Sequence, residues 1–173
     1  MKNRNIFFKT ILILYSCFIL FIYNYSNYKS KKNSFLKKYI IEENDFCDNF
    51  TKYFRKDIEE KITIVMAKLR GKQFPLYIYK ENSYLSTKLY KLGAYEANPS
   101  NNMLNALEYY AKKHNINNNK DIYILDIGGN IGWYPSLFGN FGYTILSFEP
   151  FERNIYILKK NFCLNRSSNI LIK

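Results

Sequence analysis

The sequence has little of what metal sites and disulfide-rich domains need. Its 173 residues include one histidine, His114, and three cysteines, Cys17, Cys47 and Cys163, which lie far apart and form no CxxC spacing. Closely spaced cysteines and histidines are the usual sequence sign of a zinc site, and an even number at short spacings is the sign of a disulfide framework. We therefore expect neither a disulfide framework nor a bound metal.

Acidic residues are absent from the first 41 residues, which contain eight lysines and arginines. This segment alone supplies +8 of the net charge of +12, and the remaining +4 is spread over the other 132 residues. Proteins that bind nucleic acid gather their positive charge on one element or one face. No single element after residue 41 carries such a stripe, so we expect no nucleic-acid partner.

A long apolar run opens the chain. Residues Ile6 to Tyr25 read IFFKTILILYSCFILFIYNY and include few polar side chains. The length is about the 20 residues that a helix needs to cross a bilayer, and no small-residue cleavage site of the kind found in signal peptides follows Tyr25. We predict a single-pass membrane anchor over residues 1–25, with membrane localisation. A cleaved signal peptide and a buried helix are the alternatives.

The side of the membrane on which the rest of the chain lies stays open. Positive charges flank both ends of the run, and five lysines between Lys29 and Lys38 slightly favour a cytosolic position for the residues after the run. The glycosylation triplets Asn49-Phe50-Thr51 and Asn165-Arg166-Ser167 would permit a lumenal position. Such triplets arise often by chance in a chain rich in asparagine.

A linker and a lead-in come after the run. Residues 26–34 are polar and basic, as in a short solvated tether, and residues 35–115 form the lead-in. The expected elements of the lead-in are a charged helix over 48–60, a hairpin of strands over 61–68 and 74–79, a helix from the cap Ser83 to Gly93, and a helix from the cap Ser100 to about Lys113.

Residues 116–173 alternate between apolar, β-branched runs and helical patterns. The expected order is strand, helix, strand, helix, strand, over residues 121–127, 131–139, 143–148, 151–163 and 169–173. This alternation is typical of a parallel sheet, in which the carboxyl ends of the strands lie at one edge. Ligands of such sheets bind at that edge.

The first of these strands ends in a glycine turn, which reads D-I-G-G-N-I-G-W over residues 126–133. Gly128 and Gly132 allow the backbone to turn sharply, and Asn130 tolerates the left-handed conformation better than most residues. The helix that begins near Ile131 is expected to offer unpaired N–H groups to a ligand.

Two carboxylates accompany the turn. Asp126 ends the first strand and can fix the loop or accept a hydrogen bond from a ligand's amino group, whereas Glu149 ends the second strand and can accept two hydroxyl groups of a ribose. A dinucleotide fingerprint would need glycine at the positions of Asn130 and Trp133. The pattern D-x-G-x-N-x-G fits instead, and we expect Trp133 to pack the helix onto the sheet.

The segment Asp126 to Tyr134, together with Phe148-Glu149-Pro150 and the run NFCLN over 161–165, resembles the FkbM family of S-adenosylmethionine-dependent methyltransferases. Ser86, Gly93 and Tyr95-Glu96 are similar to that family's lead-in, so the similarity covers roughly residues 74–173. Two positions depart from the family. Gly129 stands where alanine is common, which we expect to be harmless, and Pro135 enters the first helical turn, where proline is tolerated.

The resemblance implies an α/β fold with a Rossmann-like class I methyltransferase sheet, preceded by an N-terminal transmembrane helix and a small α+β lead-in. Sheets of this class have seven strands and only three fall within residues 116–173, so we expect a fragment whose first strand has an unpaired edge. The implied cofactor is S-adenosylmethionine. The implied cofactor-binding residues are Asp126, Gly128, Gly129, Asn130, Gly132 and Glu149.

These expectations describe a membrane-anchored methyltransferase that acts on an oxygen of a sugar or another small hydroxylated acceptor. The resemblance identifies no catalytic base, and we expect weak cofactor binding and no turnover from such a fragment. The alternative is a non-catalytic, membrane-tethered binding module that keeps the cofactor half of the fold. A nicotinamide-dependent oxidoreductase is disfavoured by Asn130 and Trp133. The methyl acceptor and the oligomeric state stay open.

Overall fold

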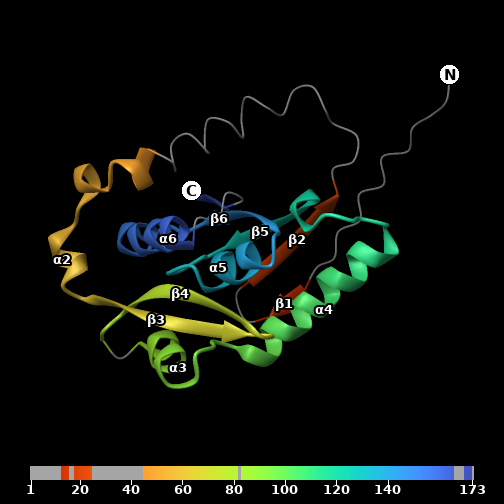
Figure 1. Cartoon of the computed structure of the whole chain (residues 1–173), viewed down its shortest axis with the longest axis horizontal. Coiled ribbons are helices and arrows are strands. Elements are labelled where there is room, and N and C mark those ends of the chain that lie inside the picture. Colours follow the sequence, from red (N-terminus) through yellow and green to blue (C-terminus); the bar gives the residue numbers. More distant parts are fainter. Residues whose placement is uncertain (1–12, 16–17, 25–44, 82, 166–169, 173) are drawn as a thin grey trace.

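The computed structural model describes residues 13–15, 18–24, 45–81, 83–165 and 170–172 (Figure 1). These residues form two β-sheets and the helices that pack between and around them. The larger sheet includes the glycine turn at its edge, and the smaller one is a hairpin from the lead-in.

The larger sheet has five strands in the order β1-β2-β5-β6-β7. The strands are β1 (Ile13–Tyr15), β2 (Phe18–Asn24), β5 (Ile122–Ile127), β6 (Thr144–Phe148) and β7 (Ile170–Ile172). The last three run parallel to one another, whereas β2 pairs with β1 and with β5 in the antiparallel sense. The sheet is therefore mixed.

Three predictions about this region are wrong. The sheet is a mixed five-stranded sheet rather than the first three strands of a parallel Rossmann-like sheet. Within the predicted transmembrane helix, residues 13–15 and 18–24 are strands, and the other residues of that run lie outside the described ones. The edge of β5 that we expected to be unpaired is paired with β2.

The prediction of membrane localisation, which rested on that helix, is also wrong. No helix in the part of the chain that the structure describes is long and apolar enough to cross a membrane. The length of the apolar run suits a helix in a bilayer, but such a run is equally compatible with strands buried in a sheet, and composition alone does not separate the two.

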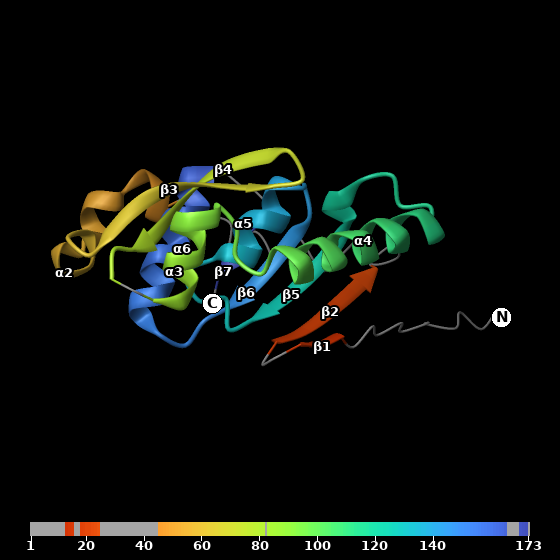
Figure 2. The same cartoon turned by 90° about the horizontal axis from the view of Figure 1, so that it is seen from below.

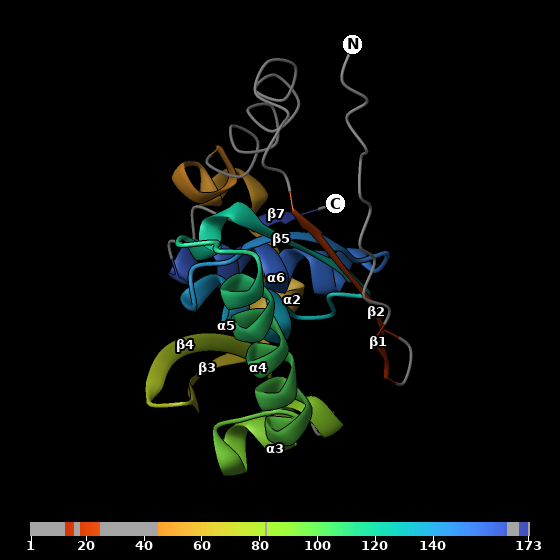
Figure 3. The same cartoon turned by 90° about the vertical axis from the view of Figure 1, so that its right-hand side faces the viewer.

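Helices α5 (Trp133–Asn140) and α6 (Glu152–Asn165) pack on one face of the larger sheet. Figures 2 and 3 show them as a layer between this sheet and the hairpin. Alternate residues of β5 and β6 that point to these helices are buried, such as Ile124 and Ile145, whereas Ile127 and Phe148 on the opposite face are exposed. The core therefore lies on the helical side of the sheet.

The hairpin consists of β3 (Ile62–Leu69) and β4 (Lys72–Tyr79), which pair along their whole length. Arg70 and Gly71 make the two-residue turn, both with positive φ (49° and 75°), as a tight hairpin turn requires. The predicted hairpin is thus confirmed. It packs against α5 and α6 on their side away from the larger sheet.

The cap predicted at Ser83 is confirmed, and the cap predicted at Ser100 is wrong. Ser83 accepts the N–H of Ser86 and begins α3 (Tyr84–Leu92), which ends at Gly93 with φ of 71°. Helix α4 (Ala97–Lys113) begins three residues before Ser100, after Glu96 in the left-handed conformation. Ser100 is instead completely buried inside α4, and its hydroxyl oxygen accepts the indole N–H of Trp133 at 3.2 Å.

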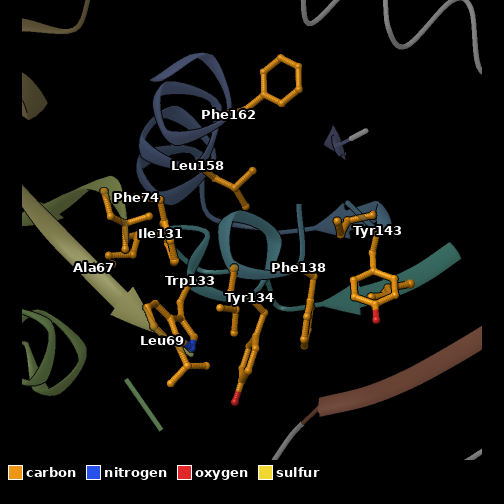
Figure 4. Packing of buried hydrophobic residues seen from close by; sticks show 14 of the residues in the cluster. Ala67, Leu69, Phe74, Ile131, Trp133, Tyr134, Phe138, Tyr143, Leu158 and Phe162 are labelled. Carbon is orange, nitrogen blue, oxygen red and sulfur yellow. The ribbon is translucent and has the colours of Figure 1, made fainter. Parts of the chain in front are cut away.

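Trp133 joins α5 to the lead-in rather than to the larger sheet. Its side chain is 2% exposed, and its ring centroid lies 5.9 Å from that of Phe74 in the hairpin. Figure 4 shows Trp133 beside Leu69 and Phe74, with Tyr134 and Phe138 following along the same helix. Trp133 is a packing residue as expected, but it packs against the hairpin and α4 rather than against the larger sheet.

The expectation of no disulfide is wrong. Cys47 and Cys163 are bonded, with their Cα atoms 5.4 Å apart, across a sequence separation of 116 residues. The bond attaches residues 45–59, which we call the linked segment, to α6. The linked segment contains η1 (Phe50–Tyr53) and α2 (Lys56–Glu59) in place of the single predicted helix over 48–60.

Candidate functional site

The glycine turn follows β5 at the carboxyl end of the parallel strands. Three of its residues have positive φ: Gly128 at 82°, Asn130 at 50° and Gly132 at 94°. Glycine adopts this conformation without strain, and asparagine adopts it more readily than most other residues. The turn therefore has the backbone shape expected from the sequence, and α5 begins directly after Gly132.

Four amide groups of the turn donate hydrogen bonds within the protein. The N–H groups of Gly128 and Gly129 both donate to the carbonyl oxygen of Phe148, at 2.8 and 3.0 Å. The N–H of Gly132 donates to the carbonyl of Gly129 at 2.8 Å. The N–H of Asn130 donates to Glu149 at 2.7 Å. These four N–H groups are therefore not free to bind a ligand.

Glu149 ties the end of β6 to the turn. Its Oε2 accepts the N–H of Asn130, and its Oε1 accepts the N–H of Phe151 at 3.0 Å and the Nδ2 of Asn154 at 3.3 Å. The side chain is only 6% exposed. A carboxylate has about four acceptor positions, so three donors leave room for one further hydrogen bond rather than the two that we expected from a ribose.

Asp126 lies beneath the turn and is 4% exposed. Its Oδ2 accepts the hydroxyl of Ser147, the paired residue on β6, at 2.7 Å. Burial raises the pKa of the Asp126 carboxyl to about 6, the bond from Ser147 opposes the rise, and the charge of Glu149 adds to it. In the described part of the chain, neither carboxylate forms an ion pair with a lysine or an arginine.

Gly129 is packed so closely that a larger residue does not fit. A Cβ atom placed on it would lie 2.1 Å from the Ser147 hydroxyl oxygen, 2.8 Å from Asp126 Oδ2 and 2.9 Å from Leu158. In this chain the surroundings of position 129 therefore require the glycine that stands where alanine is common in the resembled family. The glycine allows Asp126 and Ser147 to reach each other beneath the turn.

Asn161 belongs to the NFCLN run, and the structure shows that it connects three parts of the protein. It is completely buried on α6, where its Nδ2 donates to the carbonyls of Ile131 at 2.7 Å and of Tyr77 at 3.0 Å. Its Oδ1 accepts the N–H of Tyr77 at 2.5 Å. One side chain thus joins the glycine turn, α6 and the hairpin, a link that no local sequence pattern reveals.

A pocket of about 260 Å³ opens beside the turn. Its lining comes from Asn130 and Ile131 of the turn and from the lead-in, namely Tyr79, Ser83, Tyr84, Leu85 and Tyr95. The rings of Tyr84 and Tyr95 meet edge to face with centroids 6.1 Å apart. The lead-in therefore builds one wall of the pocket, and the glycine turn builds the other.

A second group of polar residues stands behind Tyr95. The carboxylate of Glu96 accepts the hydroxyl of Tyr134 on α5 at 2.6 Å. Burial and the neighbouring Glu96 raise the pKa of Tyr95 to about 12, so its hydroxyl stays protonated at neutral pH. Glu96 has positive φ (44°), a conformation that costs energy for a residue other than glycine. These contacts position the loop between α3 and α4, which carries Tyr95.

The predicted site residues Asp126, Gly128, Gly129, Asn130, Gly132 and Glu149 all lie at this turn or directly beneath it. Of these, Asn130 lines the pocket. Ser147, Asn154 and Asn161 support them and were not predicted. No protein-family model, curated protein or solved structure matches the chain.

Proposed function

We propose that the pocket beside the glycine turn binds S-adenosylmethionine and that the chain belongs to a methyltransferase of the FkbM type. The observation that carries this proposal is the hydrogen bonding of the turn: the amides of Gly128, Gly129, Asn130 and Gly132 are used internally, and the two carboxylates of the turn lack basic partners among the described residues. The sequence motif over residues 126–134 supports the same assignment.

The paired amides argue against a dinucleotide. Nicotinamide and flavin dinucleotides place a pyrophosphate on free N–H groups at a glycine turn and a helix N-terminus. Here the N–H groups of Gly128 and Gly129 point to Phe148, and that of Asn130 points to Glu149. A pyrophosphate would also stand close to two carboxylates, which repel it.

The same features favour a ligand that is cationic and donates hydrogen bonds. S-adenosylmethionine has a sulfonium, an ammonium and two ribose hydroxyls, and it has no phosphate. Glu149 retains one acceptor position for a hydroxyl, and its charge attracts a cation. The tyrosine wall of the pocket adds ring faces and edges, and cations bind favourably over aromatic faces.

In the proposed reaction the methyl group passes from the sulfonium sulfur to an oxygen of a sugar or another small hydroxylated acceptor. The carbon–sulfur bond breaks as the carbon–oxygen bond forms, and the hydroxyl proton passes to a base. Such a transfer depends mainly on alignment of donor and acceptor. The second candidate is a binding module without turnover. The hydrogen bonding of the turn, Glu149 and the tyrosine wall all concern binding of the cofactor, so they support this candidate equally well.

The experiment compares S-adenosylhomocysteine, the demethylated product of the cofactor, with NAD⁺ in calorimetric titrations of the full chain. We expect S-adenosylhomocysteine to bind and NAD⁺ to bind at least tenfold more weakly. Replacing Tyr84, which lines the pocket and is 70% exposed, by alanine should weaken S-adenosylhomocysteine binding about tenfold, or about 1.4 kcal/mol.

The control is Tyr90→Ala, because Tyr90 lies on the same helix, is 75% exposed and does not line the pocket. It should bind as the unaltered chain does. Preferential binding of NAD⁺, or equal losses in the two variants, would overturn the proposal. Transfer of a labelled methyl group to a sugar alcohol mixture separates the enzyme from the binding module.

A further inference from the structure

The disulfide between Cys47 and Cys163 bears on where this chain folds. It joins two segments that are 116 residues apart and are packed together in the native structure. Protein disulfides form and persist in oxidising compartments and are rare in reducing ones. A bond that holds the linked segment to α6 is therefore a sign that the chain folds where thiols are oxidised.

The glycosylation triplets at Asn49 and Asn165 differ sharply in their surroundings. A third triplet, Asn24-Tyr25-Ser26, begins at the last residue of β2, where Asn24 pairs with Ile122 of β5. Asn49 lies two residues after Cys47, in a turn at the surface of the linked segment, and its side chain is exposed. Its Nδ2 donates to Asp45 Oδ1 at 2.8 Å. An exposed bond between two side chains contributes little to stability because water replaces it readily. The Asn49 amide nitrogen is therefore available for modification.

Asn165 has a structural role instead. Its Nδ2 donates to the carbonyls of Pro75 at 3.0 Å and of Asn161 at 2.8 Å, and its Oδ1 accepts the Nδ2 of Asn140 at 3.1 Å. These bonds join α6 to the hairpin and to α5. A glycan on this nitrogen would remove them and would force the hairpin away from the end of α6.

We propose that Asn49 is an N-glycosylation site in a chain that folds in an oxidising compartment and that Asn165 is not modified. The donor is a lipid-linked oligosaccharide pyrophosphate. A bond forms between Nδ2 of Asn49 and the anomeric carbon of the donor, the bond from that carbon to the phosphate oxygen breaks, and the amide proton passes to a base of the transferase. Thr51 completes the triplet that the transferase recognises.

The test is translation of the full chain in a cell-free extract that contains microsomes of the endoplasmic reticulum. We expect a protease-protected product with one glycan that an endoglycosidase removes. Asn49→Gln and Thr51→Ala should each abolish the glycan, and Thr51→Ser should keep it. Asn24→Gln and Asn165→Gln should each leave it unchanged. Peptide mapping without reduction should recover Cys47 linked to Cys163.

Each other result counts against the proposal. A protected product without a glycan would show that Asn49 is not an acceptor. A glycan lost with Asn165→Gln would contradict the role given to that residue. A product that stays outside the microsomes, with both thiols reduced, would overturn the assignment to an oxidising compartment. None of these outcomes depends on whether the chain binds S-adenosylmethionine.

Discussion

The glycine turn and the linked segment are attached to the same core by different means. The turn is held by hydrogen bonds to Phe148 and Glu149, and by one from Asn161, all within residues 128–161. The linked segment is held by contacts between distant parts of the chain: a disulfide across 116 residues, and the ion pair of Glu59 with Lys160, whose charged atoms are 2.6 Å apart.

The two regions also differ in chemistry. Around the turn the buried groups are carboxylates, amides and a hydroxyl. In the linked segment the contacts are aromatic: Phe46 packs against Tyr53 and Tyr156 with ring centroids 5.2 and 6.1 Å apart. The comparison indicates that one region combines buried polar groups with a pocket, whereas the other attaches residues 45–59 to α6 through a disulfide and aromatic contacts.

Breaking the disulfide should give the largest effect and should leave the turn in place. In Cys163→Ser the unfolded chain regains the freedom that a crosslink over 116 residues removes, so we expect the free energy of unfolding to fall by about 4 kcal/mol. Urea unfolding measures this loss. Cys17→Ser keeps both partners of the bond and is the control. An equal loss in both variants would contradict the role of the crosslink.

A Cβ atom beneath the turn should have the next largest effect. Gly129→Ala forces contacts with Ser147 and Asp126, and overpacking of this kind costs about 1–3 kcal/mol. Ser147→Ala removes the oxygen that lies nearest, so the double variant should be more stable than the sum of the two single losses predicts. If the two single losses in the free energy of unfolding add up in the double variant, the new Cβ atom does not clash with the Ser147 hydroxyl.

The buried Asp126 should make stability depend on pH. Its pKa is about 6 in the folded chain and 3.8 in the reference state, so the folded chain binds more protons between pH 4 and 6. The free energy of unfolding should therefore fall as the pH rises through this window, by about 2–3 kcal/mol. Asp126→Asn keeps an acceptor for Ser147 and should remove the dependence. If the free energy of unfolding depends on pH equally in the unaltered chain and in Asp126→Asn, Asp126 is not the source of the dependence.

Glu149→Gln should have a smaller effect, confined to the turn. An amide side chain accepts hydrogen bonds on one side only, so the N–H of Asn130 or that of Phe151 loses its acceptor. We expect a loss of about 2 kcal/mol in urea unfolding and weaker binding of S-adenosylhomocysteine. The control is Glu152→Gln, an exposed acid on the next helix. Equal effects would show that Glu149 is not the anchor of the turn.

Local patterns predicted the turn because every feature of its backbone is encoded within a short stretch. The glycines and Asn130 marked the positive φ values, and the alternation of apolar residues placed β5, α5, β6 and α6 close to their observed bounds. The hydrogen bonds to Phe148 were not foreseen, because the pairing of two strands decides which amides remain free. For the same reason the close contact between Gly129 and the Ser147 hydroxyl was not foreseen.

The linked segment and the edge of the larger sheet could not be predicted in this way. Wide spacing of cysteines says nothing about which of them meet in space, and the partners of Cys47 and Glu59 lie on α6. The apolar run at the start of the chain has the composition of a membrane helix and of a buried strand alike. Only its pairing with β5 distinguishes them, and β5 lies far along the chain.

The most direct test of the ligand assignment is an amide-resolved NMR titration of the full chain with S-adenosylhomocysteine. We expect chemical-shift changes concentrated at Gly128 to Gly132 and at Tyr84 and Tyr95, with no such changes on addition of NAD⁺. This readout also detects weak binding. Shifts confined to other residues, or the same shifts with NAD⁺, would contradict a methyl-donor site at the glycine turn.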